Sequence, residues 1–263
     1  MHTVAYRFSA RAPRESPAAD LRPQPRLNTF TDSLVLAGQL IAHADAELLR
    51  IVSLSLRVSL SACLIGASVG LLLGAWLALA RFPGHRAVVW ALNTLLALPS
   101  VVVGLVVYLL LSRAGPLGPL GLLFTPTAMV IAQSILVVPL IAALSRRLVL
   151  EAVAEGGDQL ATLGGRPFTL AALLLLHQRQ GVLTVLLTAF GRAAAEVGAV
   201  MIVGGNIQGV TRVMTTAIAL ETSKGDLPLA LALGAVLLGV VGIVNLAIGL
   251  LQSGRGTPQE AWA

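Results

Sequence analysis

Residues 58–80 read V-S-L-S-A-C-L-I-G-A-S-V-G-L-L-L-G-A-W-L-A-L-A, without a charged residue between Arg57 and Arg81. A helix that crosses the hydrocarbon core of a bilayer needs about 20 consecutive, mostly apolar residues at a rise of about 1.5 Å per residue. This stretch meets both conditions. We therefore expect a transmembrane helix here, and the neighbouring segments are interpreted outward from it.

The composition of the whole chain also indicates a membrane protein. Of its 263 residues, 56% are hydrophobic and only 11% are charged, whereas soluble proteins carry about 25% charged residues. The net charge of +6 would suit a nucleic-acid-binding protein, but aromatic residues make up only 4% and no basic stripe alternates with them. We expect an all-α, multi-pass integral membrane protein of the inner (plasma) membrane, in contact with the lipid bilayer and with no nucleic acid.

Further charge-free apolar runs predict about five spanning helices. Pro99 lies inside the second run and should kink it, because proline removes a backbone hydrogen bond and clashes with the preceding turn. Segment 31–42 has a helical pattern but is too short to cross, so we expect it in the membrane interface. The run 114–126 is too rich in glycine and proline to be a helix. The predicted spans are 58–80, 88–111, 127–144, 182–203 and 227–251.

The remaining segments are polar. Polar loops are predicted at 145–181 and 204–226. Residues 1–29 form an Arg- and Pro-rich stretch without the apolar core of a signal peptide, and we expect a disordered tail there. A single membrane domain should cover 30–252, followed by a polar tail over 253–263.

Five spans put the two ends of the chain on opposite sides of the membrane. Cytoplasmic loops are enriched in Lys and Arg near the span ends. This rule favours a cytoplasmic loop 145–181 and an external N-terminus, since seven basic residues flank the spans on that loop's side and five on the other. The seven are Arg81, Arg86, Arg146, Arg147, Arg166, Arg179 and Arg255, and the five are Arg50, Arg57, Arg113, Arg212 and Lys224.

Several chemical functions are excluded by motifs that the sequence lacks. A P-loop nucleotide site requires Gly-Lys-Ser/Thr, but the sole lysine, Lys224, follows Ser223 and precedes Gly225. The four histidines lie in four different segments, without an H-E-x-x-H motif or a pair of catalytic carboxylates. A single cysteine, Cys63, cannot form a thiolate metal cluster. We therefore expect no enzyme active site, no cofactor and no metal site.

Arg192 and Glu196 are two charged residues inside a predicted span. They are four residues apart, so that they share one helix face. Each charge alone would cost about 2.5–3.5 kcal/mol at the bilayer centre. Two interpretations are open at this point: a self-neutralising pair packed against neighbouring helices, or a pair that lines an anion path or its gate.

The loop 145–181 is long for a connection between spans. Its sequence predicts a short helix that ends at Gly164 and Gly165, and a second helix that begins at Pro167. This pattern is typical of a partner-binding elbow, but equally of a solvated helix-turn-helix that binds no partner.

Part of this loop carries a family resemblance. Residues 158–177, D-Q-L-A-T-L-G-G-R-P-F-T-L-A-A-L-L-L-L-H, resemble the EAA loop of ABC-importer permeases, E-A-A-x3-G-x9-I-x-L-P. Gly164 occupies the glycine position, and Leu174 and Leu176 stand where the pattern has Ile and Leu. The first three residues of the segment depart from E-A-A, and its final histidine replaces the proline.

A second region is more specific. Residues 190–226, F-G-R-A-A-A-E-V-G-A-V-M-I-V-G-G-N-I-Q-G-V-T-R-V-M-T-T-A-I-A-L-E-T-S-K-G-D, closely resemble tungstate ABC-transporter permeases, which are relatives of the molybdate and sulfate permeases. The segments R-F-P-G-H-R at 81–86 and L-L-S-R-A-G-P-L-G-P-L-G-L-L-F-T-P-T-A-M at 110–129 share this resemblance. It covers about residues 33–251.

The resemblance implies the fold of a type I ABC-importer permease and a transport subunit that hydrolyses no ATP itself. In such importers two copies of the permease form the path, a cytoplasmic ATPase docks on each coupling loop, and an extracytoplasmic binding protein delivers the oxyanion. The residues implied in ATPase coupling are Asp158, Gly164, Leu174 and Leu176. Those implied in the translocation path or gate are Arg192, Glu196, Asn206, Arg212, Thr215 and Thr216.

The substrate expected from the resemblance is tungstate, with molybdate or sulfate as alternatives. A function of another class is an ion-coupled secondary anion carrier, for which Arg192 and Glu196 would be the relay or substrate site. Such carriers show paired internal repeats with broken helices in matching positions, and the sequence contains none. A purely structural membrane subunit would need neither the intramembrane charges nor the long elbow.

Overall fold

The structure, a computed structural model, describes residues 34–35, 38–39, 42–43, 46–161 and 167–253. These residues are helical apart from short connections, with no strand among them, and the described parts of the predicted interfacial segment 31–42 are helical as well. The helices are α2 Ala46–Leu79, α3 His85–Leu96, α4 Ser100–Leu111, the 3-10 turn η1 Gly118–Leu120, α5 Pro126–Ala161, α6 Pro167–His177, α7 Arg179–Ala194, α8 Gly198–Gly204, α9 Met214–Lys224 and α10 Leu227–Ser253.

Within the described chain, three helices are long and apolar enough to cross a membrane: α2, α5 over Pro126–Ala154, and α10 over Leu227–Leu250. Two bent pairs, α3–α4 at 98° and α6–α7 at 86°, raise the number of candidate spans to five. The all-α membrane fold expected from the sequence is confirmed.

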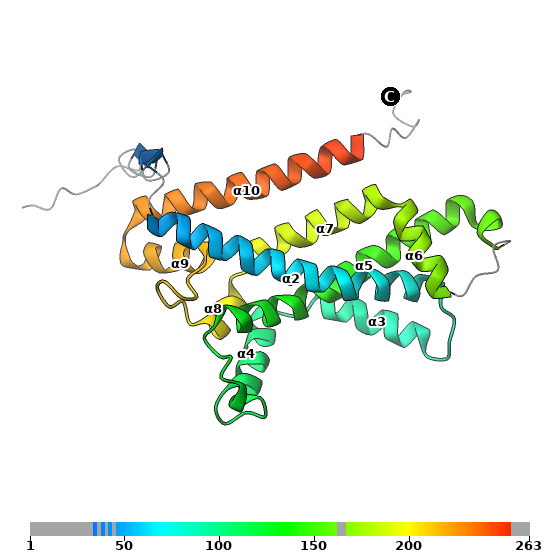
Figure 1. The fold of residues 1–263 in the computed structure, drawn as a ribbon, viewed down its shortest axis with the longest axis horizontal. Helices are drawn as coiled ribbons and strands as arrows, with labels where there is room; N and C mark the ends of the chain where they lie inside the picture. The colour runs from blue at the N-terminus through cyan, green and yellow to red at the C-terminus, as the bar shows by residue number, and fades with distance from the viewer. Residues whose placement is uncertain (1–33, 36–37, 40–41, 44–45, 162–166, 254–263) are drawn as a thin grey trace, which may run out of the picture.

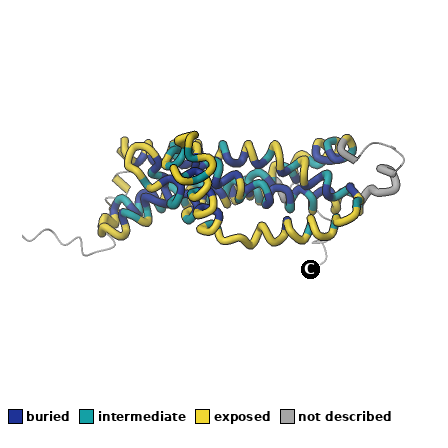
Figure 2. The backbone as a smooth tube through the Cα atoms, turned by 90° about the horizontal axis from the view of Figure 1, so that it is seen from below, coloured by how far each residue is buried: buried dark blue, intermediate teal, exposed yellow. Residues whose placement is uncertain are grey.

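The helices form an elongated bundle in which α2 and α5 run side by side (Figure 1). Helix α9 and the start of α2 lie at one end, which we name the α9 end, whereas α6 and the last turns of α5 lie at the other, the α6 end (Figure 1). Helix α10 runs along the outside of the bundle and is largely exposed (Figure 2). The two polar segments 145–181 and 204–226 are therefore at opposite ends of the molecule.

Three glycines of α2 allow its close packing against α5. Gly66, Gly70 and Gly74 are spaced every four residues and therefore share one helix face. A Cβ atom on Gly70 would lie 2.9 Å from the carbonyl oxygen of Val138, and one on Gly74 would collide with the backbone of Ala142. Small residues of this spacing let two membrane helices approach closely, so that dispersion contacts between their backbones stabilise the pair.

Helix α5 corrects the predicted end of the third span. The sequence places a loop from residue 145, but α5 continues past Arg146 and Arg147 to Ala161. These arginines are good helix formers, and Arg147 forms a 2.8 Å ion pair with Glu151 one turn further along. Helix α6 begins at Pro167 as predicted, whereas the predicted helix end at Gly164–Gly165 lies outside the described residues.

The second predicted span, 88–111, is not one kinked helix but two helices of 12 residues each. Pro99 precedes α4 in an extended conformation, with φ −61° and ψ 126°. Proline disfavours the helical conformation of the residue before it and lacks an N–H donor. The position of the break is therefore as predicted, but the helix turns by 98° rather than bending slightly.

The fourth predicted span, 182–203, is also interrupted. Helix α7 ends at Ala194 and α8 begins at Gly198, so that Glu196 lies in the break rather than inside a helix. The predicted loop 204–226 is likewise only partly a loop, because it contains α9. At the start of α9 the Thr216 hydroxyl accepts a hydrogen bond from the Val213 N–H at 3.1 Å, which satisfies one of the free donors at a helix start.

Candidate functional site

The two helix breaks meet in the bundle. Helices α4 and α8 pack so closely that a Cβ atom on Gly198 would lie 2.8 Å from the Ser100 hydroxyl, and one on Gly104 would lie 2.7 Å from the Cα of Ala199. We name the residues that join these breaks, Ser100, Gln133, Arg192, Glu196 and Thr215, the helix-break junction.

The charged pair predicted from the sequence is present in this junction. An Nη1 atom of Arg192 lies 2.8 Å from Oε2 of Glu196. The other carboxylate oxygen accepts a 3.3 Å hydrogen bond from the Ala199 N–H and so caps the start of α8. The Glu196 side chain is 4% exposed and that of Arg192 is 53% exposed. The carboxylate is thus a buried part of the fold, whereas the guanidinium faces the outside of this chain.

Polar side chains from other helices bind the backbone carbonyls at the break between α7 and α8. Gln133 on α5 donates to the carbonyl oxygen of Ala193 at 3.0 Å, and the Thr215 hydroxyl donates to that of Glu196 at 2.8 Å. The Glu196 carbonyl needs such a donor in a bilayer, where no water is available to bind a free carbonyl. Sequence reasoning missed Gln133, although an amide in the apolar run 127–144 is itself a signal.

The junction encloses very little space. A cavity of about 10 Å³ is lined by Gln133, Leu136, Val137, Arg192, Ala193 and Glu196. That volume holds about one water molecule. The buried Oε1 of Gln133 has no hydrogen-bond partner in the described chain. In this conformation, the cavity has no room for an ion with four oxygen atoms.

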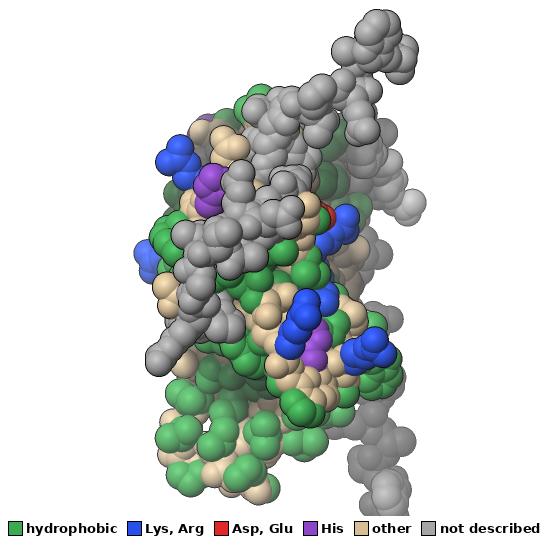
Figure 3. All heavy atoms as spheres, turned by 90° about the vertical axis from the view of Figure 1, so that its right-hand side faces the viewer, with side chains coloured by type: hydrophobic (Ala, Val, Ile, Leu, Met, Phe, Trp, Pro, Cys, Tyr) green, Lys and Arg blue, Asp and Glu red, His purple; other side chains and the backbone are tan. Residues whose placement is uncertain are grey.

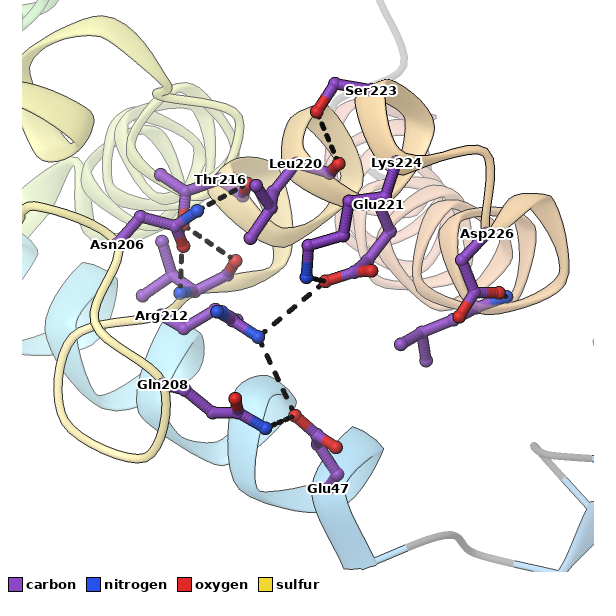
Figure 4. A network of polar contacts seen from close by, with 12 residues as sticks. Glu47, Asn206, Gln208, Arg212, Thr216, Leu220, Glu221, Ser223, Lys224 and Asp226 are labelled. Atoms are coloured by element: carbon purple, nitrogen blue, oxygen red, sulfur yellow. Dashed lines mark hydrogen bonds and ion pairs between the residues drawn. The ribbon is translucent and has the colours of Figure 1, made fainter. Parts of the chain in front are cut away.

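A second polar group lies at the α9 end (Figure 4). The Arg212 side chain is 10% exposed, and its Nη1 lies 3.8 Å from Glu47 Oε1 and 3.7 Å from Glu221 Oε1. Gln208 donates to the same Glu47 oxygen at 2.7 Å, and the Lys224 ammonium lies 3.0 Å from the same Glu221 oxygen. We name these five residues the Arg212 cluster. It joins α2, α9 and the connection between α8 and α9.

The Arg212 cluster borders a cavity of about 270 Å³. Sequence reasoning identified Arg212 but missed its neighbours, because they come from segments far apart in the chain. The residues that line the cavity are Ala46, Glu47, Arg50, Ile51, Leu54, Gln208, Gly209 and Arg212.

The other three residues predicted near Arg212 form hydrogen bonds within the chain. Asn206, in the left-handed conformation at φ 50°, donates to the carbonyl oxygen of Thr216 at 3.3 Å. The buried Thr216 hydroxyl binds the backbone of Val213, and Thr215 belongs to the helix-break junction. The structure thus brings Asn206 and Thr216 together beside the cluster and places Thr215 at the other polar group.

The α6 end is basic. Figure 3 shows Lys or Arg and His side chains on this end and little acidic surface. Leu174 is buried against Ala75 and Val149, whereas Leu176 is 73% exposed. The backbone of Asp158 belongs to α5, but its side chain, like all of Gly164, lies outside the described part of the chain. Among the described residues, no group of three or more His, Cys, Asp or Glu could hold a metal ion.

Comparison with known proteins identifies the family. The chain is 43% identical to the tungstate uptake system permease protein TupB of Peptoclostridium acidaminophilum, over 82% of this chain and 95% of the relative. It is 42% identical to a probable anion ABC transporter permease of Haloferax volcanii, over 75% and 88%, and 38% identical to the TupB of Campylobacter jejuni, over 63% and 69%.

More distant relatives point to the same family. Permeases named for molybdenum or sulfate transport are 27% to 32% identical to this chain. No protein-family profile matches the chain. The 43% identity to a relative that is covered over 95% of its length, together with the all-helical membrane fold, shows that the chain belongs to the permease subunits of ABC transporters for anion uptake, which are multi-pass proteins of the plasma membrane.

Proposed function

We propose that the chain is the permease subunit of an ATP-driven tungstate importer. The observation that carries this proposal is the identity to the tungstate uptake permeases, which is higher than the identity to the molybdenum and sulfate permeases. Molybdate is the alternative substrate, since it is also a tetrahedral dianion and differs little from tungstate in size. Membership of the ABC permease family argues against an ion-coupled secondary carrier.

A cytoplasmic ATPase subunit would dock at the α6 end. Helix α5 extends 14 residues beyond Arg147, and Leu176 offers an exposed apolar side chain on the next helix. Asp158 and Gly164 would enter the ATPase cleft. The buried Leu174 would not contact the ATPase but would hold α6 against α2 and α5. The basic α6 end (Figure 3) agrees with a cytoplasmic position under the positive-inside rule.

The coupling role can be tested at Gly164. We expect a Gly164→Glu permease to assemble with its ATPase but to lose stimulation, because a close approach of the coupling segment to the ATPase would leave no room for a long charged side chain. The measurement is the ATPase rate of the assembled complex with and without tungstate-loaded binding protein. Normal stimulation of the Gly164→Glu complex would remove this segment from the coupling mechanism.

The translocation path would run past Arg192 between two copies of this chain. Arg192 lies 13 residues into α7, about 20 Å from its start at 1.5 Å per residue. A helix that enters a hydrocarbon core about 30 Å thick at its first residue would carry Arg192 inside that core. A half-exposed guanidinium at this depth is costly in lipid, so its exposed face should meet a water-filled path or the second copy. The Arg192–Glu196 pair would form the gate.

An extracytoplasmic binding protein would deliver the ion to the α9 end. Arg212 lies there and carries guanidinium donors that could bind a dianion. Asn206, Thr215 and Thr216 are positioning residues in this proposal, since their side-chain donors already hold the backbone around it.

Uptake of labelled oxyanion tests the function. Cells that lack other tungstate systems are compared with and without this gene, under competition by molybdate and by sulfate. We expect tungstate uptake to depend on the gene, with molybdate as a strong competitor and sulfate as a weak one. Unchanged uptake on deletion would refute the proposal, and equal competition by sulfate would assign the chain to the sulfate branch.

A further inference from the structure

Arg212 is a nearly buried guanidinium without a hydrogen bond in the described chain. Its side chain is 10% exposed, and its Nε atom is buried without a hydrogen-bond partner among the residues that the structure describes. Among the described residues, the side chain makes two ion pairs, at 3.8 and 3.7 Å, which are longer than the 2.7–2.9 Å of a charge-assisted hydrogen bond. Buried donors in folded proteins are nearly always satisfied. This group therefore requires an explanation.

The carboxylates of Glu47 and Glu221 do not satisfy the Arg212 guanidinium, because each of them binds another residue more closely. The Glu221 oxygen that faces Arg212 is 3.0 Å from the Lys224 ammonium. The Glu47 oxygen that faces Arg212 accepts the 2.7 Å hydrogen bond from Gln208. The acids therefore offset the charge of Arg212 at a distance but leave its planar set of donors available.

The cavity beside Arg212 is also lined by a second cation. Arg50 lines the same cavity of about 270 Å³, and its guanidinium forms no ion pair or hydrogen bond within the described chain. The Gly209 backbone approaches this guanidinium, since a Cβ atom there would lie 3.6 Å from Arg50 Nη1. The volume is several times the ~30 Å³ of one water molecule in the liquid. Two guanidinium groups thus face a space that can hold an ion with four oxygen atoms.

The cavity lies beyond the apolar span of α2. The helix has 34 residues and is therefore about 51 Å long, whereas the hydrocarbon core is about 30 Å thick. Arg81 closely follows one end of α2, and Arg57 is the last charge before its apolar run. Arg50 is two turns further out than Arg57, so that the cavity opens at the membrane surface or in water.

We propose that this cavity is an oxyanion-binding site of the permease itself, in which Arg212 and Arg50 bind a tetrahedral dianion at the mouth of the path. A fork of guanidinium donors matches the oxygen atoms of such an ion. The ion would complete the hydrogen bonds that Glu47 and Glu221 leave unmade. This inference rests on the proposed function for the identity of the ion, but it adds a site on this subunit that the binding protein does not supply.

Calorimetric titration of the purified full-length permease with sodium tungstate, without binding protein, tests the site. We expect one saturable site per chain, weakened about tenfold or more in Arg212→Gln, because charge-assisted hydrogen bonds are lost. Arg50→Gln should weaken binding several-fold, and its folding is not at risk since Arg50 is exposed and unpaired in the described chain. The matched control is Arg113→Gln, which removes an exposed arginine elsewhere on the chain.

Three results would overturn the site: no saturable binding to the wild-type permease, wild-type affinity in both Arg212→Gln and Arg50→Gln, or competition by chloride as strong as that by molybdate. The uptake experiment keeps this inference separate from the proposed function. If tungstate uptake depends on the gene but the purified permease binds no tungstate, the site is refuted and the proposed function stands. If uptake does not depend on the gene, the proposed function is refuted.

Discussion

The side-chain hydroxyl of Thr215 donates a 2.8 Å hydrogen bond to the main-chain carbonyl oxygen of Glu196. Thr215 is in the first turn of α9, the helix that carries Glu221 of the Arg212 cluster. Glu196 lies in the break between α7 and α8, where its carbonyl has no helical partner. This hydrogen bond therefore links the segment around the Arg212 cluster to the helix-break junction.

Thr215→Val should destabilise the permease by about 1–3 kcal/mol, because it leaves the buried carbonyl of Glu196 without a donor while preserving the side-chain shape. Thermal unfolding of the purified protein in detergent measures the change. The control is Thr188→Val, since the exposed Thr188 hydroxyl binds the Thr184 carbonyl within the same helix. Equal losses of stability in both variants would show that the hydrogen bond to Glu196 contributes no more to stability than the exposed hydrogen bond of Thr188.

The ion pair of Arg192 and Glu196 predicts that neutralising its two members destabilises the protein to different extents. Arg192→Gln leaves a buried carboxylate without its cation, which should cost up to about 3 kcal/mol. Glu196→Gln leaves a half-exposed guanidinium and keeps an acceptor for the Ala199 N–H, so its cost should be smaller. Thermal unfolding of the two variants and of the double variant checks this order.

A control pair sits on the surface. Arg147 and Glu151 have the same spacing and the same 2.8 Å distance but exposed side chains, and exposed pairs of this kind contribute about 0.3–0.5 kcal/mol. Their neutralisation should change the unfolding temperature much less than Arg192→Gln. An Arg192→Gln protein as stable as the Arg147→Gln protein would contradict the assigned burial of Glu196.

The packing of α2 on α5 predicts that Gly74→Ala is damaging. A Cβ atom there collides with the Ala142 backbone, so that the two helices must separate, at a typical cost of about 1–3 kcal/mol for an overpacked site. Gly239→Ala in α10 is the matched control, since no atom of the described residues lies within 4 Å of its Cβ position. It should be neutral or stabilising. The yield and unfolding temperature of the two purified variants decide the question.

The parts of the fold that depend on local sequence were predictable. Apolar runs located the candidate spans, and Pro99 marked one break because its effect on the backbone is intrinsic to the residue. The break after Ala194 has no such signal, since alanines favour a helix. It is stabilised instead by Gln133 and Thr215, which bind the carbonyls of the break from other helices. The end of α5 was misplaced because Arg146 marks a membrane surface and not a helix end.

The candidate site likewise has features that local sequence reveals and contacts that only the packing of distant segments creates. The Arg192–Glu196 pair is visible as a four-residue spacing, but the contact of Gln208 with Glu47 joins residues 161 positions apart. Periodicity cannot predict such a contact without the packing of α2 beside the connection from α8 to α9. Arg50 was seen only as a charge at the edge of a span, although in the structure it lines the cavity of Arg212.

The arrangement of the two ends predicts the orientation in the membrane. We expect the α9 end outside and the α6 end in the cytoplasm, because basic residues gather at the α6 end (Figure 3). Cys63 is the only cysteine, so its replacement by alanine gives a background for single-cysteine labelling. Gln208 and Glu151 are exposed positions at the two ends.

An impermeant thiol reagent applied to intact cells should therefore label a Gln208→Cys protein but not a Glu151→Cys protein. Labelling of both proteins after lysis is the control for reactivity, since each cysteine must be accessible once the membrane is open. The reverse pattern in intact cells would invert the orientation. It would also move the Arg212 cavity to the cytoplasm, where it could not receive an ion from an extracytoplasmic binding protein, so the same labelling tests the direction of transport through the site.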